Sequence, residues 1–180
     1  MAILPIRTFG DPVLRERARR VEKVKSLHRR LVNNMIETMR VAPGVGLAGT
    51  QVGVLERIFV WEVEDEHGAV INPEIIARSS ETVESDEGCL SLPGLTYPVE
   101  RAVEVTVEGL DERGRPFVRT AAGLLARVFQ HEIDHLDGVL FVDRLPEEVR
   151  REAMRELTRL SLGLPSAESS FGDTPAEETL

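Results

Sequence analysis

Two histidines four residues apart, His131 and His135, lie in the segment QHEIDHLDG, with Glu132 directly after the first histidine. On an α-helix, residues at i and i+4 lie one above the other, so both imidazoles can reach one point in space. Glu132 is rotated by about 100° from His131, which brings its carboxylate to the edge of that point. The spacing predicts a catalytic metal site in which Glu132 is the general base for a water molecule on the metal.

The apolar residues around this motif favour a buried helix. Leu124, Val128, His131 and His135 share one stripe, spaced four, three and four residues apart. A buried imidazole needs a partner, and one divalent metal satisfies two imidazoles that lie on the same stripe. The alternative is a chance HExxH pattern on an amphipathic helix with exposed histidines. Burial of the helix makes the metal site the better interpretation.

The third metal ligand has to come from elsewhere in the chain. A tetrahedral catalytic site takes three protein ligands and keeps one open position. No histidine follows His135, and the downstream glutamates fall on a highly charged segment that we expect at the surface. The only cysteine, Cys89, lies upstream in the glycine- and proline-containing segment DEGCLSLPG. A lone cysteine is more often an inert buried residue, but beside an HExxH helix that lacks a ligand it is the best candidate.

Three segments together resemble the signature motifs of the peptide deformylase family. They are GVGLAGTQ at 44–51, EGCLS at 87–91 and QHEIDHLDG at 130–138. They stand in the family's order and at its spacing, and the resemblance covers roughly residues 3–160. Three ordered motifs are far more specific than HExxH alone.

The resemblance implies the chemistry of the site. It implies a metal held by Cys89, His131 and His135, with Fe²⁺ the usual ion and Zn²⁺, Ni²⁺ or Co²⁺ able to substitute. It implies hydrolysis of the N-formyl group on the N-terminal methionine of newly synthesised polypeptides, with release of formate. Gln51 and the backbone N–H of Leu90 are then expected to stabilise the oxyanion. The alternatives are a zinc peptidase and a non-catalytic, metal-stabilised relative that binds peptides.

The glycine-rich segment 44–51 is interpreted as part of the substrate site. It lacks the lysine of a phosphate-binding loop, and bare backbone at Gly44 and Gly46 can approach an extended peptide. We expect Leu124 and Val128 to form an apolar slot beside the metal, with Val45 opposite, that accepts a methionine side chain. The substrate-binding residues predicted in this way are Val45, Gly46, Leu124 and Val128.

We predict structural roles for four further residues in or near the motifs. Gly49 stands where the family more usually has alanine, and the extra glycine is expected to loosen the loop. Glu87, Arg101 and Asp134 lie close to the motifs in sequence. They suit roles in orienting the metal ligands through hydrogen bonds, and surface ion pairs are the alternative.

Composition and length favour one cytoplasmic globular domain. The chain has 180 residues, a net charge of −9 and a single cysteine, which suits a reducing compartment. The negative charge argues against a general nucleic-acid-binding surface, and no segment has the length and apolarity of a signal peptide or a membrane span. We expect a metallohydrolase domain at 1–164 and a disordered acidic tail at 165–180.

Periodicity predicts an α+β fold: mixed or antiparallel sheets packed around a central helix that carries HExxH, with a C-terminal helix. Helices are predicted at about 24–40, 123–138 and 146–162, and strands at 57–63, 69–76, 103–110 and 117–123. The buried face of the first helix is predicted to hold Leu27, Leu31, Met35 and Met39.

The C-terminal helix carries a stripe of three cations at i, i+4 and i+8, namely Arg151, Arg155 and Arg159. Arginine pairs bidentately with phosphate, so the stripe is interpreted as a contact to ribosomal RNA, in line with a family that acts on nascent chains. The alternative is a solvated charged face in which Glu147 pairs with Arg151.

Overall fold

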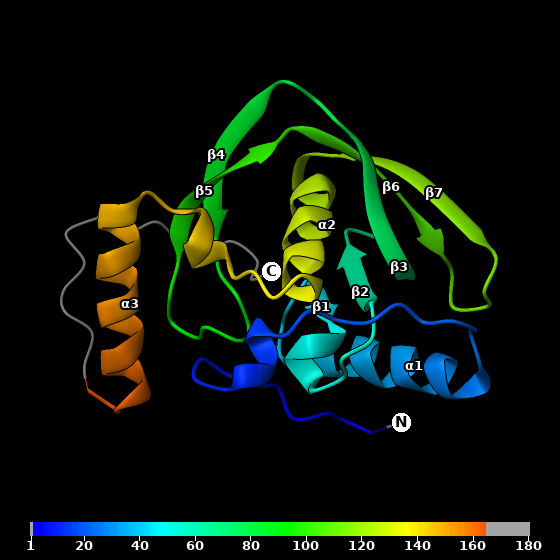
Figure 1. Cartoon of the computed structure of the whole chain (residues 1–180), viewed down its shortest axis with the longest axis horizontal. Coiled ribbons are helices and arrows are strands. Elements are labelled where there is room, and N and C mark those ends of the chain that lie inside the picture. Colours follow the sequence, from blue (N-terminus) through cyan, green and yellow to red (C-terminus); the bar gives the residue numbers. More distant parts are fainter. Residues whose placement is uncertain (1, 165–180) are drawn as a thin grey trace.

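The computed structural model describes residues 2–164 as strands around a central helix, α2 (Figure 1). The helices are α1 (Ser26–Val41), α2 (Gly123–Leu136) and α3 (Glu147–Ser161), with short 3-10 helices η1 (Pro12–Arg15), η2 (Gly49–Val52) and η3 (Phe141–Arg144). The strands are β1 (Gly46–Ala48), β2 (Ile58–Val63), β3 (Glu66–Arg78), β4 (Thr82–Glu87), β5 (Tyr97–Ala102), β6 (Glu104–Leu110) and β7 (Pro116–Ala122). The predicted α+β class is confirmed.

Every strand pair in the described part of the chain is antiparallel. A five-stranded sheet has the order β1-β2-β3-β6-β7, and β4 and β5 form a separate two-stranded ribbon. The long strand β3 runs to the point where the chain enters β4, so sheet and ribbon together arch over α2 in Figure 1. The sheet has its register broken by bulges after Ile71 and Ile75, where β3 pairs with β6.

Strand β2 is packed between two helices. Its side chains alternate between faces, as the period of two requires: Phe59 and Trp61 join the core beneath α2, while Ile58 and Val60 join the core beneath α1. Phe129 of α2 contacts both aromatic rings, with centroids 5.5 Å from Phe59 and 5.7 Å from Trp61. Phe129 thereby packs the middle of the central helix against the sheet.

Helix α2 begins at a glycine with positive φ, and a second such glycine follows shortly after its last residue, Leu136. Gly123 has a φ of 59° and Gly138 a φ of 75°, conformations that favour glycine. A side chain at Gly138 would also approach the backbone oxygen of Arg15 to 2.5 Å. The predicted start of the HExxH helix at Gly123 is confirmed, while its last residue is Leu136, slightly before the predicted end at Gly138.

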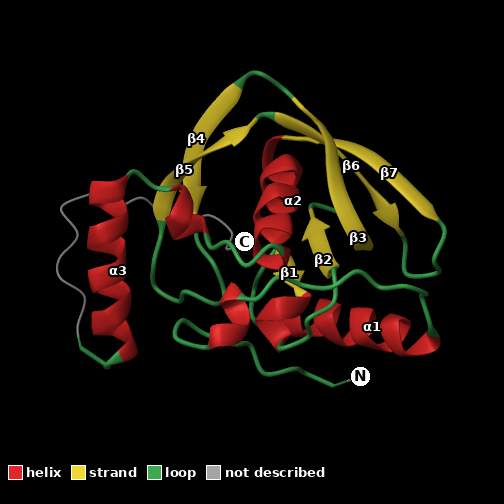
Figure 2. Ribbon diagram, in the orientation of Figure 1, coloured by secondary structure: helices red, strands yellow, loops and turns green. Residues whose placement is uncertain are grey.

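A third hydrophobic cluster packs the C-terminal helix α3 against the segment that carries Cys89. Ala153 and Leu157 of α3 pack with Cys89, Leu92 and Phe141. Figure 2 shows α3 standing beside the β4–β5 ribbon, away from α1. No helix within residues 2–164 is both long and apolar enough to cross a membrane. The predicted tail at 165–180 lies outside the described residues.

Three features of the secondary structure differ from expectation. The β4–β5 ribbon was not predicted, because its sequences, TVESDE and YPVERA, are polar and lack an apolar alternation. The polar connection between the first two strands is a two-residue turn at Glu64 and Asp65, because β3 begins at Glu66. Leu27 is 49% exposed, so its assignment to the buried face was wrong.

The buried stripe of α1 explains the error at Leu27. Its members are His28, Val32, Met35 and Met39, spaced four, three and four residues apart. A helix advances by about 100° per residue, so each step of four residues drifts by about 40°. Three such steps carry Leu27 away from the face of Met39.

Candidate metal centre

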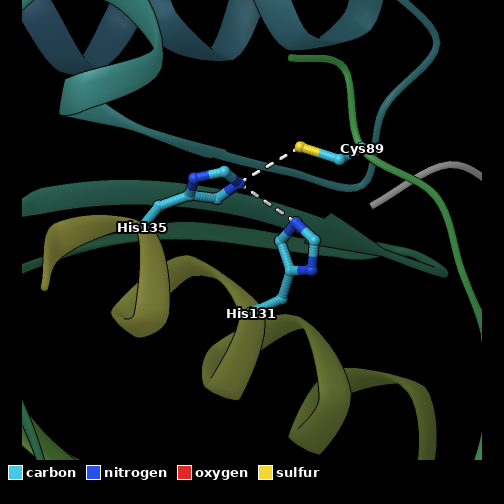
Figure 3. A group of neighbouring side chains, drawn as sticks. All are labelled: Cys89, His131 and His135. Atoms are coloured by element: carbon cyan, nitrogen blue, oxygen red, sulfur yellow. Dashed lines mark hydrogen bonds between the residues drawn. The ribbon is translucent and has the colours of Figure 1, made fainter. Parts of the chain in front are cut away.

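Cys89, His131 and His135 point at one another from two segments of the chain (Figure 3). The two imidazoles project from one face of α2, and Cys89 reaches them from the segment that follows β4. Nε2 of His135 lies 3.2 Å from Nε2 of His131 and 3.2 Å from Sγ of Cys89. All three ligand atoms lie within 4.8 Å of one another, and each residue is at most 2% exposed.

The donor set fits a single divalent metal ion. Tetrahedral coordination at ordinary metal–nitrogen and metal–sulfur distances separates ligand atoms by roughly 3.3–3.6 Å, close to the separations found. Burial holds the pKa of His135 well below its ordinary value, which keeps a lone pair available. Burial also lowers the pKa of His131, but the Cys89 sulfur and Glu87 outweigh it and raise that pKa. This excess of negative charge is what a cation would neutralise.

Glu87, the last residue of β4, fixes the orientation of His131. Its Oε2 lies 3.0 Å from Nδ1 of His131, so Nδ1 carries the proton and Nε2 faces the metal position. Burial by itself would raise the pKa of Glu87, but hydrogen bonds from Arg101 and His131 lower it to about 2. The ring of His131 also stacks on that of Phe141, with centroids 6.3 Å apart and an interplanar angle of 25°.

A buried ion network extends outward from Glu87. Arg101 donates through Nε and Nη2 to Glu87, at 2.8 and 2.9 Å, and through Nη1 to Asp134 at 2.6 Å. Arg144 completes the network with a bond of 2.6 Å to Asp134. Burial opposes the charge of Arg101, yet these carboxylates raise the pKa of Arg101 above its ordinary value. Glu87, Arg101 and Asp134 therefore form a buried network and not surface ion pairs, and Glu87 is the member that contacts the predicted ligand His131.

Glu132 follows His131 directly on α2, and within residues 2–164 its carboxylate forms no ion pair. Its side chain is fully buried, and within residues 2–164 neither carboxylate oxygen has a hydrogen-bond partner. Burial raises the pKa of Glu132 to about 7. A carboxylate so arranged can accept and return a proton near neutral pH.

Two hydrogen-bond donors lie near the thiol of Cys89: the side-chain amide of Gln51 and the backbone N–H of Leu90. Gln51 accepts a bond from the N–H of Ala48 at 2.7 Å, which turns its amide nitrogen toward Ser91 and Cys89, at 3.2 and 3.5 Å. The backbone N–H of Leu90 makes no hydrogen bond within residues 2–164. Both groups can donate to an oxygen that develops negative charge near the metal position.

The glycines of segment 44–51 leave room for side chains of the site. A Cβ at Gly44 would lie 2.8 Å from the tip of Leu90, and one at Gly46 would lie 2.4 Å from Oε1 of Glu132. Gly49 is also tightly enclosed, because a Cβ there would meet the backbone oxygens of Val54 and Glu56 at 2.9 and 3.0 Å. Gly49 therefore sits in a packed turn, against the expectation of a loosened loop.

The predicted apolar slot lies within one core cluster. Val45 and Val128 are buried in the cluster beneath the sheet, and Leu124 packs against it while half-buried. Val45 immediately precedes β1, which is the edge strand of the five-stranded sheet. The three residues thus share one packing region.

A Cys/His/His metal-holding site on an HExxH helix, enclosed by antiparallel sheets, defines a class of metal-dependent hydrolase. The profile of the polypeptide deformylase family matches residues 3–151. The chain belongs to the polypeptide deformylase family.

Individual relatives agree in sequence and in fold. A peptide deformylase of Acidothermus cellulolyticus is 51% identical over 157 residues, which cover 87% of each chain. The crystal structure of the Thermus thermophilus peptide deformylase superposes with a TM-score of 0.84 at 48% identity, covering 89% of this chain and 99% of that one. The Ehrlichia chaffeensis enzyme in complex with actinonin superposes with a TM-score of 0.85 at 38% identity, covering 89% and 98%.

Proposed function

We propose that this chain removes the N-formyl group from the N-terminal methionine of newly synthesised polypeptides and releases formate. The observation that carries the proposal is a buried, unpaired carboxylate, Glu132, directly beside three converging metal ligands. A purely structural metal site needs no such base. Family membership supports the same activity.

Cys89, His131 and His135 would hold the metal, for which we propose Fe²⁺, with Zn²⁺, Ni²⁺ or Co²⁺ as substitutes. The bound ion would supply Lewis acidity and lower the pKa of a coordinated water toward neutrality. Elemental analysis of chain purified without oxygen tests the choice of ion. A stoichiometric amount of zinc and no iron would contradict it.

Glu132 has the environment of a proton carrier. Its pKa of about 7 lets it accept a proton from the attacking water and later return it to the departing amine. Gly46 leaves space for its carboxylate, and the burial of the site excludes competing solvent. A Glu132→Ala variant is expected to keep its metal and to lose about 10²–10⁴-fold in kcat.

Gln51 and Leu90 are proposed as the donors that stabilise the tetrahedral oxyanion. The amide of Gln51 is held by Ala48, and the Leu90 N–H has no competing acceptor in the described chain. Losing one such donor typically costs about 2.7–4 kcal/mol of barrier. Gln51→Leu is expected to show a loss of this size in kcat with little change in KM.

The substrate peptide is proposed to lie along β1. That strand is a sheet edge, so an extended peptide can pair with it as an added strand. Val45, Leu124 and Val128 would accept the methionine side chain, with Gly46 admitting the backbone. Leu124 is half-buried while Val128 is fully enclosed, so Leu124→Ala should raise KM for formyl-Met peptides without unfolding the core.

One assay separates the three candidate functions. The metal-loaded chain should release formate from a formyl-Met peptide and leave an acetyl-Met peptide and internal peptide bonds intact. Cleavage of an internal bond would instead identify a zinc peptidase. Peptide binding without turnover by fully metal-loaded chain would identify a non-catalytic relative.

We also propose that the chain works in the cytoplasm and docks on ribosomal RNA through α3. Arg151, Arg155 and Arg159 are all exposed on α3, opposite the buried Ala153 and Leu157. Within residues 2–164, the ion pair between Glu147 and Arg151 that belongs to the alternative is absent.

Charge reversal tests the docking. Replacing the three α3 arginines by glutamate should weaken co-sedimentation with ribosomes, and added salt should weaken binding of the native chain. Turnover of a short free peptide should be unchanged. A matched triple reversal at Arg29, Arg30 and Arg113, all exposed, is the control. Equal loss in both triples, or no loss in either, would refute a specific contact through α3.

A further inference from the structure

A cleft with a volume of about 540 Å³ opens on the far side of α2 from the metal ligands. Its apolar lining residues are Ala18, Pro73, Ile75 and Ile133. Its charged lining consists of Arg17, Arg20, Arg57, Arg78, Glu74 and Asp137. Four arginines therefore face two carboxylates on a chain whose net charge is −9.

The cleft is separate from the metal centre. Ile133 lies two residues from both His131 and His135, and a helix turns by about 200° over two residues. The side chain that lines the cleft therefore leaves α2 on the face opposite the two imidazoles. A ligand in the cleft has the thickness of the helix between itself and the site of hydrolysis.

The walls of the cleft are held by hydrogen bonds between distant segments. The N–H of Ala18 donates to the carbonyl of Leu136 at 2.9 Å, and the N–H of Arg57 donates to the carbonyl of Arg19 at 2.8 Å. Asn72, with a φ of 54°, donates from its side chain to the carbonyl of Val21 at 2.9 Å. The bulge in β3 that follows Ile71 turns the next residues of the strand toward the cleft. The backbone segments that carry the arginines are therefore held together by hydrogen bonds.

The four arginines differ in the number of hydrogen bonds and ion pairs that they already make. The guanidinium of Arg57 is buried and donates hydrogen bonds to Asp137 at 2.7 Å and to the carbonyl of Pro73 at 3.3 Å. Arg57 therefore holds the walls of the cleft together. Arg20 is paired with Glu74. Arg17 is 81% exposed and only 3.6 Å from the oxygen that Arg57 already occupies.

Arg78 has the fewest charge partners of the four arginines in the described part of the chain. It is exposed, and within residues 2–164 no carboxylate lies at ion-pair distance from it. Arg17 and Arg78 therefore leave the cleft with two positive charges that its own carboxylates do not balance. Such a surplus attracts an anion at short range despite the acidic surface elsewhere, because solvent screens distant charge.

We propose that this cleft binds a small phosphate-bearing anion of nucleotide size. Guanidinium groups pair bidentately with phosphate oxygens, and phosphate groups carry the negative charge that the surplus attracts. The volume falls in the range of about 300–1,000 Å³ that small-molecule sites occupy, and the apolar lining residues offer contact to a sugar or base. A longer nucleic-acid strand fits less well, because the adjoining hollow of about 240 Å³ is bordered by Glu74 and Glu108.

Calorimetric titration of the nickel-loaded chain with pyrophosphate and with ATP, at low salt, tests the proposal. We expect one binding event per chain. Arg17→Ala with Arg78→Ala should raise Kd by at least about tenfold. The matched control is Arg29→Ala with Arg30→Ala, which removes the same charge from exposed positions on α1 and should leave Kd within about twofold. Formyl-peptide turnover should be unchanged in both variants, which shows that both are folded.

Each other outcome overturns the proposal. Pyrophosphate binding that is unaffected by the cleft substitutions would assign the ligand to the metal or to another surface. An equal loss in the cleft and control variants would mean that only net charge matters. A twelve-nucleotide single-stranded RNA that binds the cleft while pyrophosphate and ATP do not would make it a nucleic-acid contact.

Discussion

Gly46 offers the sharpest test of how Glu132, the proposed general base, is positioned. A Cβ at this residue would lie 2.4 Å from Oε1, 2.9 Å from Cδ and 3.0 Å from Cγ of Glu132, whereas ordinary contact begins at 3.4 Å. The backbone at Gly46 is paired with Trp61 in the sheet, and Glu132 stands on a fully packed helix, so the carboxylate has to yield. In a Gly46→Ala variant it moves by roughly 1 Å.

A displacement of that size is costly in an enzyme. Misplacing a catalytic group by about 1 Å can cost about 100-fold in rate, which corresponds to about 2.7 kcal/mol of barrier. We therefore expect Gly46→Ala to lower kcat for a formyl-Met peptide about 100-fold. Metal content should stay at one ion per chain, because the three atoms nearest to the new methyl group all belong to Glu132 and none to a metal ligand.

A double-mutant cycle separates this effect from damage to the fold. Glu132→Ala removes the atoms with which the methyl group collides, so Gly46→Ala should add almost nothing in that background. The measurements are kcat, KM and metal content for the four proteins. A kcat for Gly46→Ala within about threefold of the native value, or a full additional loss in the Glu132→Ala background, would refute the positioning role.

Three further predictions follow from the same geometry. Cys89→Ala should lose its metal in elemental analysis while Ser91→Ala keeps it, and full metal in the first variant would remove Cys89 from the site. Arg101→Met should lower stability in urea unfolding by about 3–5 kcal/mol, because it leaves the buried carboxylates of Glu87 and Asp134 uncompensated; Arg113→Met, at an exposed position, is the control, and equal effects would contradict the network. Gly49→Ala should destabilise the chain by about 1–3 kcal/mol through its clash with two backbone oxygens, and an unchanged unfolding midpoint would show that the turn can shift.

The sequence by itself determined the ligands and the elements that carry them. The spacing of His131 and His135 follows from the helical repeat, which is a local property of the chain. Helices α1, α2 and α3 and the β6–β7 hairpin were predictable for the same reason: apolar periodicity and glycine punctuation act over short stretches. Cys89 was identified from its motif and from the lack of another ligand, although nothing local in its segment brings it to the helix.

Only the tertiary structure decided how these residues are placed in three dimensions. The polar β4–β5 ribbon has no periodic signal, yet it carries Glu87 and Arg101 into a buried network with Asp134. The closeness of Gly46 to Glu132 and the cleft behind α2 arise where segments distant in sequence meet. Burial, and with it the raised pKa of Glu132, depends on what packs around a residue. A sequence pattern specifies the faces of an element, whereas packing between elements decides which faces meet.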